Sequence, residues 1–580
     1  MSLLSIVCLS AVVLLVGYFV YGRVLARLLR LDPNKPTPAV AQRDDVDYVP
    51  IEPKFLMSQH FSAIAAAGPI VGPIVAGVAF GWLPALLWIL VGSIFVGGVH
   101  DLFALVASVR HKARSIAEVV RDHMTRRSYV MFLAFVWLSL VYVIVAFTDV
   151  TAGAFLGSVE LESGQVVRGG GIATSSLLYL ALPIVMGLLL RYTRLTVGWA
   201  TVIFLPLVGL AIWFGQEIPL DLAAATGLNQ AQAHKVWDVL LLAYCFVASM
   251  VPMWLLLQPR GHLGGYFLYI VLIGGALGML FGSLPIEYPA FTGWESEKLG
   301  ALFPFMFITI ACGACSGFHS VVASGTTSKQ LRRETDARPI GYGAMLMEGM
   351  VAVISLACVM MLAANSEHIS GPNAKGPSVL YGLGVGNFLE VVGIPAAFGV
   401  AFGLMAFTTF VYDTLDVCTR LGRYILQELF GSSGTVSRWA ATALTAGTPL
   451  AFLLWQPTDA GGNVVPAWRV FWVLFGASNQ LLAALTLLGV TVWLWRTRRV
   501  MWVWFVAGLP TLWMYSISMW GLGTIILRDW QTWLPATPVP YVALVLVVLG
   551  GLMLVEAVIV LLRPMPGPPP REKPAFAPTT

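Results

Sequence analysis

The sequence predicts an all-α polytopic membrane protein with about 15 transmembrane helices, built as a five-plus-five inverted repeat with extra helices. Of its 580 residues, 58% are hydrophobic and 11% are charged, whereas soluble domains carry about 25% charged residues. Apolar runs of about 20 residues, long enough to cross a bilayer, recur along the whole chain. One run carries two Gly-Pro pairs at its centre, as broken helices at transporter sites do.

The predicted spans are centred near residues 14, 69, 96, 140, 182, 205, 247, 274, 312, 352, 403, 446, 482, 512 and 551. The loops between them alternate between basic ones and ones poor in Lys and Arg. The positive-inside rule therefore places the N-terminus outside and the C-terminus in the cytoplasm of a multi-pass protein. Basic residues follow the first span (Arg23, Arg27) and none precedes it, so we expect an uncleaved helix rather than a signal peptide.

This alternation divides the chain into segments of different character. Residues 376–393 are Gly-rich and favour a re-entrant or surface helix, while 414–431 place apolar and charged residues on different faces, as amphipathic surface helices do. The predicted segments are an extra N-terminal helix (1–26), a cytoplasmic loop (27–57), the first repeat half (58–215), the second repeat half (236–413), the cytoplasmic amphipathic helix (414–431), the C-terminal transmembrane helices (436–563) and a disordered cytoplasmic tail (564–580).

The Gly-Pro pairs Gly68-Pro69 and Gly72-Pro73 interrupt the second span. Proline removes a backbone donor, and glycine removes the side chain that would stiffen the turn. Lipid cannot satisfy the freed backbone groups, so such a break requires burial by other helices or contact with water or a solute. We predict that these four residues line a substrate site; a packed kink is the alternative.

A second candidate break lies five spans later, in the stretch Tyr244–Trp254, which has Pro252 at its centre. It runs in the opposite direction to the first broken span, as an inverted repeat requires. We predict that Ser249, Pro252 and Trp254 contribute to substrate binding. A simple proline kink is the alternative.

Small, hydroxyl and imidazole side chains are concentrated near residue 320. Their oxygens could hold a coupling cation, and a histidine inside a membrane is expensive enough to suggest a function. Close helix packing is the alternative. The predicted ion-coupling residues are His60, Ser316, His319, Ser320, Ser324 and Thr326.

Other polar residues within or beside the spans have no assigned role. We expect His100, Asp101 and Asp149, together with Asp413 and Asp416, to be water-reachable anchors or partners of loop arginines. Asn479 is expected to form interhelical hydrogen bonds. None of the six cysteines is placed for a loop disulfide. Cys312 and Cys315 have the spacing of half a metal site, but nothing completes it, so we expect them to be small buried hydrophobes.

Several of these stretches resemble the signature of the carbon starvation protein A (CstA) family, and the match covers about residues 50–500. The stretches that carry the resemblance are Gln59-His60-Phe61, Gly68-Pro69-Ile70-Val71-Gly72-Pro73, His100-Asp101-Leu102-Phe103, Tyr244-Cys245-Phe246-Val247-Ala248-Ser249, Ser316-Gly317-Phe318-His319-Ser320, Ser324-Gly325-Thr326-Thr327 and Gly476-Ala477-Ser478-Asn479-Gln480. His100 departs from the family pattern, which has Gln there. The chain resembles the family's shorter forms.

The resemblance implies a bacterial inner-membrane importer with the leucine-transporter-like fold of amino acid-polyamine-organocation transporters. It implies cation-coupled uptake of pyruvate or short peptides in response to carbon starvation.

From the residues and the resemblance together we predict a secondary active importer coupled to protons or sodium, without an enzymatic activity, a cofactor or a nucleic-acid partner. Its expected partners are the lipid bilayer and a small solute, and its oligomeric state stays open. A membrane sensor or structural subunit that keeps the fold without transport is the alternative.

Overall fold

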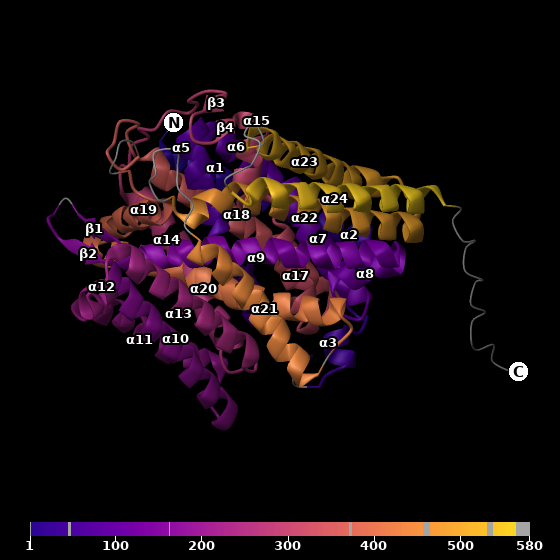
Figure 1. Ribbon diagram of the computed structural model, residues 1–580, viewed down its shortest axis with the longest axis horizontal. Helices are drawn as coiled ribbons and strands as arrows, with labels where there is room; N and C mark the ends of the chain where they lie inside the picture. The colour runs from indigo at the N-terminus through magenta and orange to yellow at the C-terminus, as the bar shows by residue number, and fades with distance from the viewer. Residues whose placement is uncertain are drawn as a thin grey trace, which may run out of the picture.

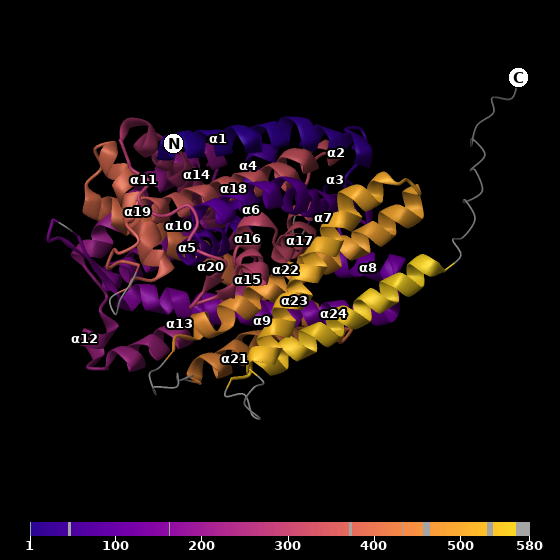
Figure 2. The same cartoon turned by 90° about the horizontal axis from the view of Figure 1, so that it is seen from above.

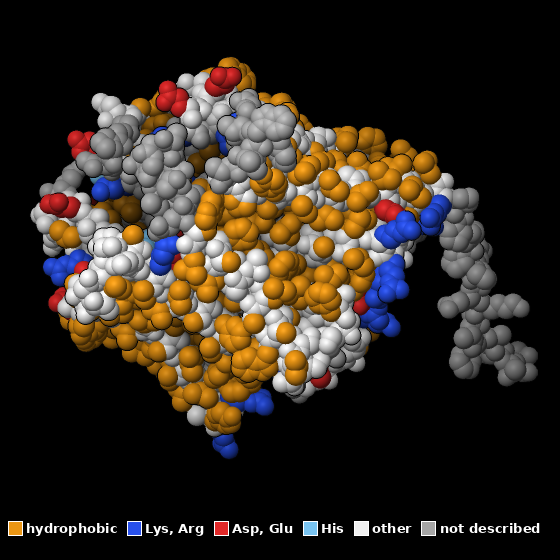
Figure 3. Space-filling model, in the orientation of Figure 1, with side chains coloured by type: hydrophobic (Ala, Val, Ile, Leu, Met, Phe, Trp, Pro, Cys, Tyr) orange, Lys and Arg blue, Asp and Glu red, His pale blue; other side chains and the backbone are white. Residues whose placement is uncertain are grey.

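The computed structural model describes residues 2–44, 48–161, 163–369, 374–432, 434–455, 465–529 and 537–563. Most of its long helices run along or obliquely to the long axis of the molecule (Figure 1). Seen from above, α1 (Leu3–Val16) lies along one side and α24 (Val539–Leu562) along the other, and α5, α16, α17 and α22 lie between them (Figure 2). Apolar side chains cover much of the face seen in Figure 3, as expected for contact with lipid.

The first part of the chain folds into α2 (Gly22–Leu29), α3 (Pro38–Ala41), α4 (Pro53–Ile64), α5 (Gly68–Phe80), α6 (Trp82–Gly92), α7 (Gly98–Arg110), α8 (Ile116–His123), α9 (Arg126–Leu156), α10 (Gly169–Tyr192), α11 (Val197–Glu217), α12 (Leu222–Thr226), α13 (Gln230–Met250) and α14 (Leu257–Phe281). The second part contains α15 (Leu302–Thr309), α16 (Ala311–Ala314), α17 (Gly317–Gly325), α18 (Ala344–Met360), α19 (Pro377–Val391), α20 (Ala396–Leu429), α21 (Thr435–Leu454), α22 (Ala467–Arg498) and α23 (Leu509–Asp529). Two antiparallel hairpins, β1 (Ser158–Glu160) with β2 (Val166–Arg168) and β3 (Glu295–Ser296) with β4 (Gly300–Ala301), lie in the loops.

The described residues contain 11 helices that are long and apolar enough to cross a membrane, or up to 12 if the bent pair α4 and α5 is one span. The all-helical membrane class is therefore confirmed, whereas the predicted count of about 15 spans and the five-plus-five repeat are not. The expected span near residue 312 accounts for part of the difference, because it is divided into α15, α16 and α17.

One of the two predicted re-entrant or surface helices differs from the structure. Residues 414–431 were expected to form a separate amphipathic helix, but α20 continues through them to Leu429, and both Leu415 and Arg423 are buried. The surface prediction is wrong because Arg420 and Arg423 donate to carbonyls at the end of α13 instead of facing water. Residues 376–393 form α19, which packs against α14 and α20. The predicted tail, 564–580, lies outside the described residues.

The first broken helix is present, but the break precedes the Gly-Pro pairs. The axes of α4 and α5 meet at 46° across Ala65–Ala67, and Ala65 has φ −79° and ψ 62°. Pro69 lies in the first turn of α5, where its missing N–H removes no helical hydrogen bond. Pro73 lies inside α5 and cannot donate to the carbonyl of Pro69. The prolines therefore start α5 and weaken its first turns.

The second predicted break, Tyr244–Trp254, is not the interruption of a span. α13 ends at Met250, α14 begins at Leu257, and Pro252 lies in the connection between them. The interruption lies instead in the segment 302–325, where Cys315 and Ser316 have extended backbone conformations between α16 and α17. α16 packs directly against α5, and α17 against α4 and α7. The two interrupted segments therefore meet in the protein interior.

Gly72 allows this close approach, and its replacement provides a test of it. A Cβ at Gly72 would lie 2.4 Å from the Thr309 carbonyl oxygen and 3.2 Å from the Ile310 Cα. We expect Gly72→Ala to destabilise the protein by about 1–3 kcal/mol through overpacking, measured as a lower melting temperature in detergent. Gly209→Ala, in α11 with nothing within 4 Å of the added Cβ, is the matched control. Equal melting temperatures for the two variants would contradict the close approach.

Candidate functional site

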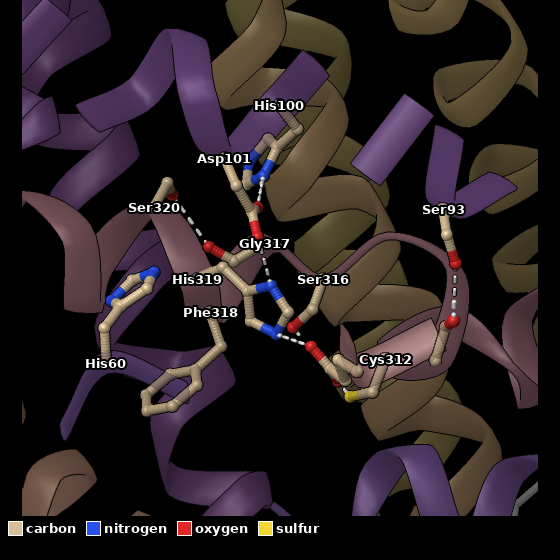
Figure 4. Close-up of polar contacts among 12 residues, drawn as sticks. His60, Ser93, His100, Asp101, Cys312, Ser316, Gly317, Phe318, His319 and Ser320 are labelled. Carbon is tan, nitrogen blue, oxygen red and sulfur yellow. Dashed lines mark hydrogen bonds and ion pairs between the residues drawn. The ribbon is translucent and has the colours of Figure 1, made fainter. Parts of the chain in front are cut away.

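Four ionisable side chains from three helices form a buried chain where the interrupted segments meet (Figure 4). His319 on α17 places its Nδ1 atom 2.8 Å from the Asp101 Oδ2 atom of α7. Its Nε2 atom lies 3.2 Å from Glu348 Oε2 of α18. On the other side of Asp101, the Nδ1 atom of His100 lies 2.7 Å from Oδ1. All four side chains are buried at 1% exposure or less.

The geometry of this chain fixes where its protons can lie. An ionised Asp101 can only accept hydrogen bonds, so each imidazole Nδ1 atom must donate to it. The remaining His319 nitrogen, Nε2, then faces Glu348 at 3.2 Å. If His319 is neutral, Nε2 can accept a proton from Glu348; if it is charged, Nε2 donates to the carboxylate. The two groups face each other at this distance, but neither Nε2 nor the Glu348 oxygens have a hydrogen-bond partner, so one proton can be carried by either His319 or Glu348.

Counting charges gives the cluster two states. With Asp101 ionised, His100 neutral and one proton carried by either His319 or Glu348, the net charge is −1. A second proton on the His319–Glu348 pair makes the cluster neutral. Since an uncompensated charge inside a membrane protein is costly, gain of a proton stabilises the buried cluster, and a nearby anion would be repelled only by the deprotonated state.

Residues around the cluster are mostly bound to one another. His60, on α4, places Nδ1 2.8 Å from Thr327 Oγ1, and its Nε2 atom has no partner. The Oδ1 atom of Asn479 accepts from Ser316 Oγ at 3.2 Å and from the Phe318 N–H at 3.0 Å. Asn479 therefore holds the start of α17, which supports the interhelical role expected for it.

The other hydroxyls predicted for ion coupling bond to their own helix. Ser320 donates to the Gly317 carbonyl at 2.7 Å and contacts Thr486 Oγ1 at 3.0 Å. Ser324 donates to the Ser320 carbonyl, and Thr326 to the Val322 carbonyl. Such bonds leave oxygen lone pairs free to accept, but the hydroxyl protons are already used.

The predicted substrate residues fall into two separate places. Gly68, Pro69, Gly72 and Pro73 lie in the first turns of α5, where Gly68 packs against Cys312. The second group lies elsewhere, because α13 packs mainly against α9, α20 and α21. In that group Ser249 is in the last turn of α13, Pro252 is exposed in the following connection, and the Trp254 ring packs near Tyr192.

A second buried ionic cluster joins α14 to α20. Arg260 on α14 pairs with both Asp413 and Asp416, and Tyr244 and Ser62 donate to the same two carboxylates. Arg260 is 1% exposed and lies within a helix. For Asp413 and Asp416 the expected pairing with an arginine is therefore confirmed, whereas the expectation of water-reachable anchors is wrong. It is also wrong for His100 and Asp101, which lie inside the bundle.

A much larger cavity than the space at the cluster lies elsewhere in the described part of the chain. A cavity of about 850 Å³ between α6, α15 and α23 has an almost wholly apolar lining that includes Trp88, Phe307 and Trp513. Beside His60 there is a cavity of about 20 Å³, lined also by Arg260 and Asp413. The space beside His60 is enough for about one water molecule, so the interior next to the α4–α5 break is closed in this conformation.

Sequence reasoning missed Glu348 as a site residue. The signal was available, because Glu348 is the only acidic residue of the apolar helix Ala344–Met360, and ionisable residues inside spans mark proton or solute pathways. The contact between Asp101 and His319 could not be predicted from the sequence, since the two residues are 218 positions apart.

Interrupted helices that meet around buried ionisable side chains, within a polytopic helical bundle, define a membrane transporter. The family profile of carbon starvation protein CstA matches residues 2–375 and 365–521, and the chain belongs to this family. It is 33% identical to the pyruvate/proton symporter BtsT of Escherichia coli, over 90% of this chain and 81% of the relative. It is also 33% identical to the peptide transporter CstA of Bacillus subtilis, over 85% of each.

Among solved structures, a manganese transporter of Eremococcus coleocola in complex with an aromatic bis-isothiourea compound is similar with a TM-score of 0.49. The identity is 12%, and the match covers 89% of this chain and 98% of that one. The transporter MhsT in complex with L-phenylalanine is similar with a TM-score of 0.46 and 12% identity, over 87% of this chain and 98% of the other.

Proposed function

We propose that this protein imports a small carboxylate such as pyruvate together with protons across the bacterial inner membrane. The observation that carries the proposal is the buried chain at the meeting point of two interrupted segments, in which His319 is hydrogen-bonded to Asp101 and faces the unpartnered Glu348 carboxyl group at 3.2 Å. Imidazole is the side chain that titrates closest to neutral pH. A chain of carboxyl and imidazole groups is therefore suited to carry the coupling proton.

Coupling follows from the two charge states of the cluster. The protonated, neutral cluster lets an anionic carboxylate approach the first turn of α5, where the positive end of the helix dipole favours negative charge. After a proton leaves toward the cytoplasm, the cluster carries a charge of −1 and repels the anion. The proton and the anion therefore enter, cross and leave together.

The Arg260 cluster favours protons over sodium as the coupling ion. A carboxylate contributes its charge to a sodium site only if that charge is not already balanced, and the Asp413 and Asp416 carboxylates already face the Arg260 guanidinium. The two acidic groups of the His319 cluster, Asp101 and Glu348, face imidazoles, which bind protons or transition metals. These arrangements support proton coupling from both sides of α4.

The charge distribution supports the predicted orientation. Lys and Arg side chains gather at the end of the molecule where α8 and the C-terminal end of α24 lie, and several Asp and Glu side chains mark the opposite end (Figure 3). By the positive-inside rule the basic end faces the cytoplasm. We therefore propose an outside N-terminus and a cytoplasmic C-terminus, with use during carbon starvation inferred from the family.

Uptake into liposomes tests the proposal directly. The purified protein is reconstituted without sodium, and labelled pyruvate is added under an imposed inward proton gradient, with and without a protonophore. We expect accumulation above the external concentration that the protonophore abolishes and that a sodium gradient does not replace.

Each other result has a definite meaning. Uptake that ignores both gradients would contradict coupled transport and indicate a channel. Uptake of labelled dipeptides but not of pyruvate would contradict the substrate class. If neither solute enters, the chain would be a sensor or structural subunit that keeps the transporter fold.

A further inference from the structure

Three side chains of types that can ligate a metal, separate from the His319 cluster, lie near the end of α9 and the start of α13. The Nε2 atom of His234 on α13 is 3.1 Å from Asp149 Oδ1 on α9 and 3.9 Å from Asp238 Oδ1 on α13. The ligand atoms of the three residues all lie within 4.8 Å of one another. His234 and Asp238 are four positions apart, so they project from one face of α13.

The charges of these three residues do not sum to zero among themselves. Asp149 and Asp238 are 8% and 3% exposed at their side chains, and the Oδ1 atom of Asp238 has no hydrogen-bond partner. A protonated His234 would leave a net charge of −1. A divalent cation with neutral His234 would bring the net charge to zero and give the Asp238 oxygen a partner; a proton on Asp238 or the neighbouring Lys235 charge would compensate the carboxylates without filling that open ligand position.

The separations match a metal coordination sphere. Nitrogen and oxygen ligands at about 2.0–2.2 Å around a tetrahedral ion lie about 3.3–3.6 Å from each other. The observed separations of 3.1 and 3.9 Å bracket that range. The other Asp149 oxygen, Oδ2, accepts the backbone N–H of Trp468 at 2.9 Å, which orients the carboxylate as an outer-shell partner orients a metal ligand.

The surroundings provide an open position and an entry path. A cavity of about 210 Å³ is lined by Asp149, His234, Pro377 and Trp468, which leaves room for water to complete the coordination. His234 is 27% exposed, so an ion can reach the site from solvent. One imidazole and two carboxylates suit zinc-class ions, whereas magnesium and calcium prefer oxygen ligands alone.

We propose that Asp149, His234 and Asp238 bind a divalent transition-metal ion of the zinc class that ties the end of α9 to the start of α13. The ion crosslinks two helices that already pack together, and it stabilises that end of the bundle. The site takes no part in the proton cluster, and the proposal stands independently of the proposed transport function.

Metal binding to the intact, metal-stripped protein in detergent tests this proposal. Co²⁺ is the probe, because its visible absorption reports four-coordinate geometry, and Zn²⁺ is the competitor. We expect one equivalent of Co²⁺ to bind, Zn²⁺ to displace it, and Zn²⁺ to raise the melting temperature. His234→Gln and Asp238→Asn should each weaken binding by about a hundredfold, the upper end of the cost of losing even an outer-shell partner.

A second histidine pair provides the matched control. The Nε2 atoms of His111 and His123 lie 2.8 Å apart, so this pair is the most plausible competing site among the described histidines. His123→Gln should leave binding and thermal stabilisation unchanged. Loss of binding in His123→Gln but not in His234→Gln would overturn the proposal. A wild-type protein that binds no Co²⁺ would overturn it as well, and His234 would then be the protonated partner of the two aspartates.

Discussion

Replacing Glu348 with Gln is expected to abolish proton-driven accumulation while leaving solute exchange across the membrane intact. The amide keeps the size of the side chain but carries no charge, so a protonated His319 balances Asp101 and the cluster stays neutral without releasing its proton. We expect net uptake under a proton gradient to fall by about a hundredfold, at the low end of what removing a proton-transferring group costs. Exchange of labelled for unlabelled pyruvate needs no net proton movement and should continue.

The two assays together separate coupling from folding. A Glu348→Gln protein that neither accumulates nor exchanges would be a folding or binding defect and would contradict the assigned role. A variant that still accumulates pyruvate would place the coupling proton elsewhere. Thr524→Ala is the matched control, because this exposed hydroxyl on α23 donates only to its own helix, and both activities should remain near wild type.

Replacing Arg260 with Met is expected to destabilise the protein by about 3–5 kcal/mol, because it leaves buried carboxylates without their cation. Asp413 and Asp416 both pair with the Arg260 guanidinium and are 3% exposed or less. The measurement is the melting temperature in detergent, together with the yield of monodisperse protein. The exposed Arg332 provides a control, and Arg332→Met should change little.

A triple variant distinguishes the loss of charge balance from the loss of packing. Arg260→Met combined with Asp413→Asn and Asp416→Asn removes all three charges and keeps similar volumes. We expect it to recover most of the lost stability, because fully replacing a buried ion cluster is often neutral. If the triple variant is as unstable as Arg260→Met, the charge balance is not what Arg260 provides.

Sequence reasoning located the interrupted helices only in part. The Gly-Pro pairs correctly indicated an interruption beside α5, because their effect is local: proline lacks an N–H and starts a helix well. Pro252 was misread because proline also suits connections between helices, and the sequence around it is apolar on both sides. The true second interruption, at Cys315 and Ser316, contains no proline, so the absence of a helix-breaking residue kept it from being predicted.

The candidate site was likewise predicted only in part from the sequence. His319 could be predicted because an imidazole in an apolar span is unusual, and His60 stood next to a broken helix. Asp101 was placed at a water-reachable helix end because the position of a span in the bilayer was judged from charged loop residues alone. In the structure His100 and Asp101 belong to α7, whose residues 98–109 are all buried, so the carboxylate faces other helices.

The sequence by itself determined the membrane class, the transporter family and the interruption beside α5. These properties follow from hydropathy, charge alternation and Gly-Pro chemistry, which act over neighbouring residues. Only the tertiary structure decided that His319 joins Asp101 to Glu348 and that Arg260 lies between two aspartates. Those contacts depend on which helices cross and how closely, as Gly72 against Thr309 shows, and such packing is set by the whole bundle.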